Sequence, residues 1–222
     1  MLDPILLQYH STTLRLSDFE LLNGNRWLND TVIGFYYEYL EQKHKPAMAY
    51  ASLLSPTVAH WLTYAAYDDV AGNDDLLHAF RTRDYIFVPV NDGNEETKLA
   101  GTHWSLLVYA KRENKFIYYD SLNQYNTVAA KHTMNRIIQC LDVSGAQFVV
   151  IRVPLQKHVT SRILQRVILS KDYSGIGLFA VLQDDSWFWT IESDDMPDTQ
   201  QWRVDIKMLV RQLQLEGIAA QP

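Results

Sequence analysis

The chain has 222 residues, of which 47% are hydrophobic and 21% are charged, and its 20 basic and 26 acidic side chains leave a net charge of −6. This length and apolar fraction suit one globular domain and exclude a disordered chain. The acidic balance argues against nucleic acid as the partner, because phosphate contacts require a basic face. The locally basic stretch 157–171 is interpreted as a solvated helical face.

Cys140 is the single cysteine, so no internal disulfide and no cysteine-rich zinc site can form. This usage is typical of a reducing compartment. The first 14 residues lack the pattern of a signal peptide, and no apolar run approaches the roughly 18 residues that would span a membrane. We therefore expect an intracellular protein, in the cytoplasm or nucleus, that is monomeric, contacts no membrane and needs no cofactor or metal.

Helical spacing of apolar residues marks the first elements of the chain. It predicts a helix over 29–45, with Asn29 or Asp30 as the N-cap, and a second helix over 55–67 that Ser55 opens. Runs rich in β-branched and aromatic residues then predict strands. These lie at 84–92, 102–112 and 114–122, followed by a helix at 127–142, a strand at 146–155, a buried helix opening at 176 and an amphipathic helix at 199–217.

The strands at 102–112 and 114–122 are joined through the charged turn residues Lys111 to Asn114, which predicts a β-hairpin. The order of elements as a whole predicts an α+β layered domain. His103 stands at the start of one hairpin strand, and Asp120 stands at the end of the other. Such ends are neighbours in an antiparallel pair. A carboxylate beside an imidazole fixes the tautomer and raises the basicity of the ring, as nucleophilic catalysis requires, although a structural pair would look the same.

Three longer stretches accompany this pair, in the order "RWLNDTVIGFYYEYL", "GTHWSLLVY" and "FIYYDSLN", before a late Gly-apolar-aromatic run. Together they resemble the Ulp/SENP family of cysteine proteases (peptidase C48-like), and within it the NEDD8-specific deneddylases. The resemblance is strong over 18–125, weaker through 155 and ragged from 156 onwards. It implies a papain-like, Ulp-type α+β fold, with a central mixed β-sheet flanked by helices, in a single ubiquitin-like-protease domain over 1–222.

The same resemblance implies an activity and a site. Members of this family cut ubiquitin-like modifiers after a terminal Gly-Gly, so the implied partner is NEDD8 or another ubiquitin-like protein. His103 would be the general base and Asp120 its orienting carboxylate. Trp27 and Trp104 would sandwich the Gly-Gly tail, since two indole faces leave a slot that excludes larger side chains. Asp30 would meet a basic residue of the modifier. The alternatives are core tryptophans and a helix-capping Asp30.

The nucleophile of the family stands in a pattern of Gln, five residues, Cys, Gly and an apolar-aromatic-small run. The best match, "GLFAV" at 177–181, puts the cysteine position at Ile176, which has no nucleophilic atom. In an alternative register Ser174 and Gly175 replace Cys-Gly, and anchoring on "DY" would put Gly175 itself at the cysteine position. No register supplies a thiol, and Cys140 is expected to be a buried structural residue.

The oxyanion glutamine of the family is also displaced. Ser170 stands where this glutamine is expected, whereas the candidates Gln156 and Gln165 lie 20 and 11 residues before Ile176. Residues 156–171 therefore represent an insertion of roughly a dozen residues or an error in the gene model. Three functions stay open: an active thiol or serine protease, an inactive relative that binds a ubiquitin-like protein, and a structural interaction domain. The missing thiol favours the second.

Overall fold

The structure is a computed structural model that describes residues 2–23, 26–93, 101–151 and 199–216. The chain forms two compact units, one made of Met1–Lys43 with Gln156–Pro222 and the other of His44–Leu155. The predicted insertion at 156–171 and the predicted helix opening at 176 lie outside the described residues. The assignment of residues 1–222 to a single domain stays a prediction.

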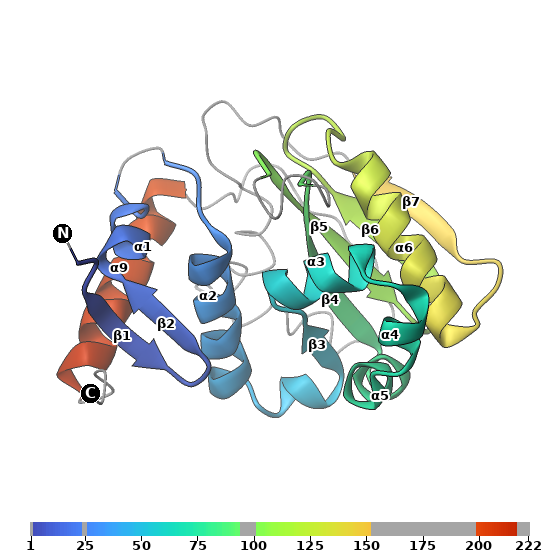
Figure 1. Ribbon diagram of the computed structural model, residues 1–222, viewed down its shortest axis with the longest axis horizontal. Coiled ribbons are helices and arrows are strands. Elements are labelled where there is room, and N and C mark those ends of the chain that lie inside the picture. Colours follow the sequence, from blue (N-terminus) through green and yellow to red (C-terminus); the bar gives the residue numbers. More distant parts are fainter. Residues whose placement is uncertain (1, 24–25, 94–100, 152–198, 217–222) are drawn as a thin grey trace. The chain divides into compact units, whose positions relative to one another are not determined.

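The described part of the first unit contains a β-hairpin and helices from both ends of the chain (Figure 1). The hairpin strands pair antiparallel through a turn in which His10 has a φ of 47°. The C-terminal helix, predicted from its amphipathic spacing, packs against the first hairpin strand. The elements are β1 (Ile5–Tyr9), β2 (Thr12–Arg15), α1 (Leu16–Glu20), α2 (Asp30–Lys43) and α9 (Thr199–Leu215).

Helix α2 begins where the sequence predicts it. The Asn29 side chain accepts a hydrogen bond from the Val32 amide at 3.0 Å, so Asn29 is the cap and Asp30 is the first helical residue. The helix buries the side chains that recur at helical spacing. These are Val32, Ile33, Phe35, Tyr36, Tyr37 and Leu40.

The second unit is built on a five-stranded sheet in the order β3-β4-β5-β6-β7. The two outer pairs are parallel and the two inner pairs are antiparallel, so the predicted mixed sheet and the predicted hairpin are both confirmed. Strands β4 and β5 are buried along their whole length, as expected for strands covered on both faces. The strands are β3 (Ala51–Leu53), β4 (Tyr85–Asn91), β5 (Trp104–Ala110), β6 (Lys115–Tyr119) and β7 (Gln147–Ile151).

Helices cover one face of this sheet, where α3 and α6 contact β4 and each other (Figure 1). Ser55 caps α3 and Pro56 is its first residue, but α3 ends at Tyr64 rather than Tyr67, because the chain turns there into a separate short helix. The helical elements are η1 (Ala47–Ala49), α3 (Pro56–Tyr64), α4 (Tyr67–Ala71), α5 (Asp74–Thr82) and α6 (Thr127–Leu141).

The core of the second unit lies between these helices and the sheet. Its side chains come from the helices and from alternate positions of the strands, as the two-residue period of a strand requires. The largest belong to Phe80, Tyr109, Phe116 and Tyr118. This packing fixes the end of β4, the start of β5, the end of β6 and the N-terminus of α6 relative to one another. Among the described helices none is long and apolar enough to cross a membrane.

Candidate active site

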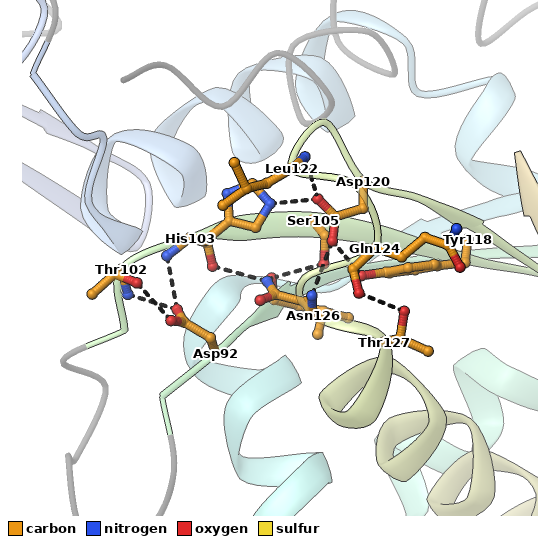
Figure 2. A network of polar contacts seen from close by, with 11 residues as sticks. Asp92, Thr102, His103, Ser105, Tyr118, Asp120, Leu122, Gln124, Asn126 and Thr127 are labelled. Atoms are coloured by element: carbon orange, nitrogen blue, oxygen red, sulfur yellow. Dashed lines mark hydrogen bonds and ion pairs between the residues drawn. The ribbon is translucent and has the colours of Figure 1, made fainter. Parts of the chain in front are cut away.

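The polar centre of the second unit is the pair formed by His103 and Asp120. His103 directly precedes β5 and Asp120 directly follows β6, and the β5–β6 pairing brings these two ends together. Imidazole Nε2 and carboxylate Oδ1 lie 2.6 Å apart, and both side chains are fully shielded from solvent. Figure 2 shows the ring pointing at the carboxylate. The structure thus joins the two residues that the sequence singles out, and their catalytic roles stay predictions.

Asp120 is held by four hydrogen bonds, enough to occupy all lone-pair directions of a carboxylate. Besides His103, the Tyr118 hydroxyl donates to Oδ2 at 2.6 Å, the Leu122 amide donates to Oδ1 at 2.7 Å and the Asn126 amide donates to Oδ2 at 2.9 Å. Burial by itself favours the neutral acid. The hydrogen bonds outweigh it, with that of His103 the strongest, and they lower the pKa of Asp120 to about 2.

The low pKa of Asp120 decides where the imidazole proton sits. An ionised carboxylate only accepts hydrogen bonds, so Nε2 of His103 carries the hydrogen that bridges to Oδ1. A proton taken from a nucleophile would then go to Nδ1, while Asp120 stabilises the imidazolium that forms. Burial, and next the bond to Asp120, raise the pKa of Tyr118, which keeps this hydroxyl a donor. The arrangement can serve a general base.

The backbone of His103 is fixed by the end of β4. Asp92 accepts hydrogen bonds from the amides of His103 and Thr102 at 2.7 and 2.6 Å, and from the Thr102 hydroxyl at 2.7 Å. Gly101 lies against the neighbouring Asn91 so closely that a Cβ there would sit 1.5 Å from the Asn91 Oδ1. A side chain there would displace that of Asn91, whose Oδ1 accepts a hydrogen bond from the Gly93 amide at 2.7 Å, so glycine lets the chain pass close to Asn91 on its way to His103.

Asn126 is a site residue that the sequence interpretation missed. It stands at the N-terminus of α6, is 2% exposed, and donates from Nδ2 to the carbonyls of His103 at 3.0 Å and Val90 at 3.2 Å. The available signal was an asparagine directly before a helical pattern, which indicates only a cap. Asp92 and Tyr118 were missed as well, because a single polar residue in or next to a strand forms no repeating pattern that would indicate its partner.

The predicted tail-binding residues belong to different units. Trp104 opens β5 in the second unit and is 7% exposed, whereas Trp27 precedes α2 in the first unit and is 38% exposed. Asp30 is half-buried in the first turn of α2 and leaves the capping to Asn29. The slot between the two indoles and the role of Asp30 therefore stay predictions. Three further predicted positions, Ile176, Ser174 and Gln156, lie outside the described residues.

Cys140 is remote from this pair. It lies one residue before the end of α6, is 8% exposed in the core, and burial raises the pKa of its thiol, only partly opposed by the Arg136 charge. Asn126, which bonds the His103 carbonyl, stands at the opposite end of this helix. At 1.5 Å per residue, fourteen residues separate the two ends by about 20 Å. The only thiol of the sequence therefore lies outside the reach of His103.

A buried imidazole oriented by an ionised carboxylate is typical of hydrolases that activate a nucleophile. Residues 26–166 match the Ulp1 protease family, C-terminal catalytic domain, and this chain belongs to that family. It is 31% identical over 225 residues to NEDD8-specific protease 1 of Arabidopsis thaliana, across 98% of this chain and 97% of that protein. It is also 34% identical over 161 residues to sentrin-specific protease 8 of Homo sapiens, across 71% and 75%.

A solved structure agrees on the fold. The SUMO protease Ulp1, with its catalytic cysteine oxidized to a sulfinic acid, superposes with a TM-score of 0.64 at 18% identity, over 98% of this chain and 90% of that one. The match to a further relative, from Dictyostelium discoideum, covers 55% of that protein. The implied Ulp-type fold and family membership are thereby confirmed.

Proposed function

We propose that this chain binds the C-terminal Gly-Gly tail of a ubiquitin-like protein, with NEDD8 as the first candidate, and that its peptidase activity is strongly impaired. One observation carries the proposal. The His103–Asp120 pair is complete and buried, yet the only thiol lies at the far end of α6. The base of a thiol protease is present in this chain without a cysteine that it can reach.

The names of the relatives support the class of partner. NEDD8-specific proteases occur in Arabidopsis thaliana and in Schizosaccharomyces pombe, where the identity is 33% over 128 residues. SUMO is the partner named for Ulp1, and ubiquitin for a bacterial effector of the same fold. These modifiers share the ubiquitin-like fold, so NEDD8 is the first protein to test and SUMO and ubiquitin are the comparisons.

The size of the expected impairment follows from the chemistry. A thiolate forms because an adjacent imidazole lowers the pKa of the thiol, and a serine hydroxyl in its place is much less acidic. Loss of the nucleophile from a catalytic triad lowers turnover on the order of 10⁶-fold. Binding of the tail need not weaken to the same degree, because the contacts to the tail are made by other side chains.

The first experiment separates binding from catalysis. We expect calorimetry to detect NEDD8 binding that Trp27→Ala weakens, whereas a NEDD8 probe with a thiol-reactive C-terminus should not label the protein. Tyr67→Ala, which removes another exposed aromatic side chain, is the matched control and should leave binding unchanged. Efficient cleavage of a NEDD8 precursor would contradict the impaired enzyme. Absence of binding to NEDD8, SUMO and ubiquitin would leave only the structural role.

The second experiment restores a thiol. In a Cys140→Ala background every thiol has been removed, so any labelling comes from an introduced cysteine. We expect Ile176→Cys to label with the probe, and His103→Gln to abolish that labelling. Ser174→Cys tests the alternative register in the same way. Labelling of Ser174→Cys but not of Ile176→Cys would move the nucleophile position by two residues. Labelling of neither would contradict a usable base at His103.

A further inference from the structure

Asn126 makes hydrogen bonds to three chain segments at the site (Figure 2). Its amide donates to Asp120 Oδ2 at 2.9 Å, which adds to the hold on the carboxylate. Its side-chain Nδ2 donates both to the His103 carbonyl at 3.0 Å and to the Val90 carbonyl at 3.2 Å. One residue thus links the end of β4, the residue before β5 and the loop that follows β6.

The side chain of Asn126 makes these bonds instead of capping its own helix. An asparagine N-cap usually accepts a hydrogen bond from an amide of the first turn. Asn29 does so for α2 and Asn73 for α5, each through Oδ1. At α6 no such cap bond forms, and Asn126 Oδ1 is buried without a hydrogen-bond partner among the described residues. The side chain is therefore directed across the sheet end and not along its own helix.

The consequence for His103 is that both polar groups of its backbone are held. Asp92 accepts from the amide at 2.7 Å, and Asn126 donates to the carbonyl at 3.0 Å. With the backbone fixed, the imidazole can move only about its side-chain torsions, and the 2.6 Å bond to Asp120 settles these. The Asn126 amide also holds the Asp120 carboxylate, through Oδ2, the oxygen that His103 does not contact.

We propose that Asn126 is the positioning residue of the His103–Asp120 pair. Its Nδ2 sets the distance between the imidazole and the carboxylate by holding the His103 carbonyl against the end of β4. This role rests on the proposed function, in which the pair is the base of the site. The role acts through His103 and requires no contact between Asn126 and the modifier or the scissile bond.

The test uses the full chain without any modifier. The buried Nε2 proton of His103 should give a downfield NMR resonance that exchanges slowly, assigned by its loss in His103→Gln. Asn126→Ser keeps a residue that caps helices well but is too short to make both crossing bonds. We expect it to speed exchange of this proton about tenfold or more, because the hydrogen bonds from Asn126 to the His103 and Val90 carbonyls are lost. Asn73→Ser, the same change at the start of α5, should leave the resonance and its exchange unchanged.

Two further measurements make the outcome decisive. Thermal unfolding shows whether Asn126→Ser stays folded. Asn126→Asp is a second variant of equal size that also caps well but cannot donate to the two carbonyls, and it should speed exchange of the proton in the same way. Wild-type exchange in either folded variant would overturn the proposal. Equal acceleration in Asn73→Ser would overturn it as well, since the effect would then be general loosening. Because the readout needs no modifier, failure here leaves tail binding standing, and failure of tail binding leaves this result standing.

Discussion

Asp120 shows how a buried charge can be stabilised by hydrogen bonds alone. Two side chains and two backbone amides donate to its two oxygens, and the residue is 5% exposed. Tyr118 belongs to β6, His103 directly precedes β5 and Asn126 directly precedes α6, while the Leu122 amide comes from the loop after β6. All four donors are already in place in the folded chain. The carboxylate is thereby ready to stabilise a positive charge on His103 without rearrangement.

The same contacts tie folding stability to pH. The pKa of Asp120 falls from 3.8 to about 2 on folding, so ionised Asp120 stabilises the fold by about 2 kcal/mol above pH 4 to 5, and this contribution disappears as the pH falls to 2. We expect Asp120→Asn to lower the free energy of unfolding by about that amount at pH 7 and by much less near pH 2. Urea unfolding at both pH values measures the difference. Asp69→Asn, at an exposed position, is the control, and an Asp120→Asn effect that does not change with pH would refute this origin.

At the residue scale, the sequence predicts the His103–Asp120 pair but not the residues that hold this pair in position. His103 and Asp120 could be placed because the ends of two adjacent antiparallel strands must meet. Asn126 could not, since its position before α6 predicts a cap, and only the folded sheet brings the carbonyls of Val90 and His103 to its side chain. The role of Gly101 is likewise not predictable from the sequence, because it depends on the Asn91 side chain that packs against it in the fold.

At the scale of elements, a buried side chain of α9 holds the segment between α1 and α2. Arg203 is 1% exposed, and its two terminal nitrogens donate to the carbonyls of Leu21 at 2.5 Å and Arg26 at 2.6 Å. Burial lowers its pKa, and in the described part of the chain no carboxylate pairs with it. The contact fixes the segment that leads directly into Trp27.

We therefore expect Arg203→Met to lower the free energy of unfolding by about 2 kcal/mol. Methionine retains most of the apolar stem but leaves two carbonyls without their charged donor, and relief of the buried charge offsets part of the loss. Arg211→Met, on the exposed side of the same helix, should change it by less than about 0.5 kcal/mol. Denaturant unfolding followed by circular dichroism measures both variants, and equal stabilities would show that the Arg203 bonds contribute nothing net.

Elements with long periodic patterns were predictable, and short ones were not. Helices α2, α6 and α9 and strands β4 to β6 follow from the spacing of their apolar residues. Strand β3 has three residues, and its parallel pairing with β4 is a long-range contact that no local pattern encodes. Helix α5 did carry a signal, in Asn73 followed by Leu76, Leu77 and Phe80, but its acidic start was not interpreted as a helix terminus.

At the scale of the whole molecule, the predicted tail slot draws on both units. Trp27 comes from the unit that contains both ends of the chain, and Trp104 comes from the unit built on the five-stranded sheet. The resemblance predicts that the two indoles hold the same two glycines. Side chains that share one ligand group lose binding energy non-additively, whereas independent contacts add.

A double-mutant cycle tests whether the two tryptophans hold the same glycines; this prediction rests on the proposed function. Trp27→Ala removes the exposed indole, and Trp104→Phe keeps the core filled while narrowing the aromatic wall, because Trp104 is largely buried. We expect the double variant to bind NEDD8 about 1 kcal/mol more tightly than the sum of the two single losses implies. Once one indole has been removed, the remaining indole contributes little binding energy, so its removal costs less. Calorimetry on the four proteins gives the coupling. Trp27→Ala combined with Trp61→Phe, a change in α3 of the same unit as Trp104, should be additive, and additivity in the Trp27–Trp104 cycle would mean that the two tryptophans do not share the tail.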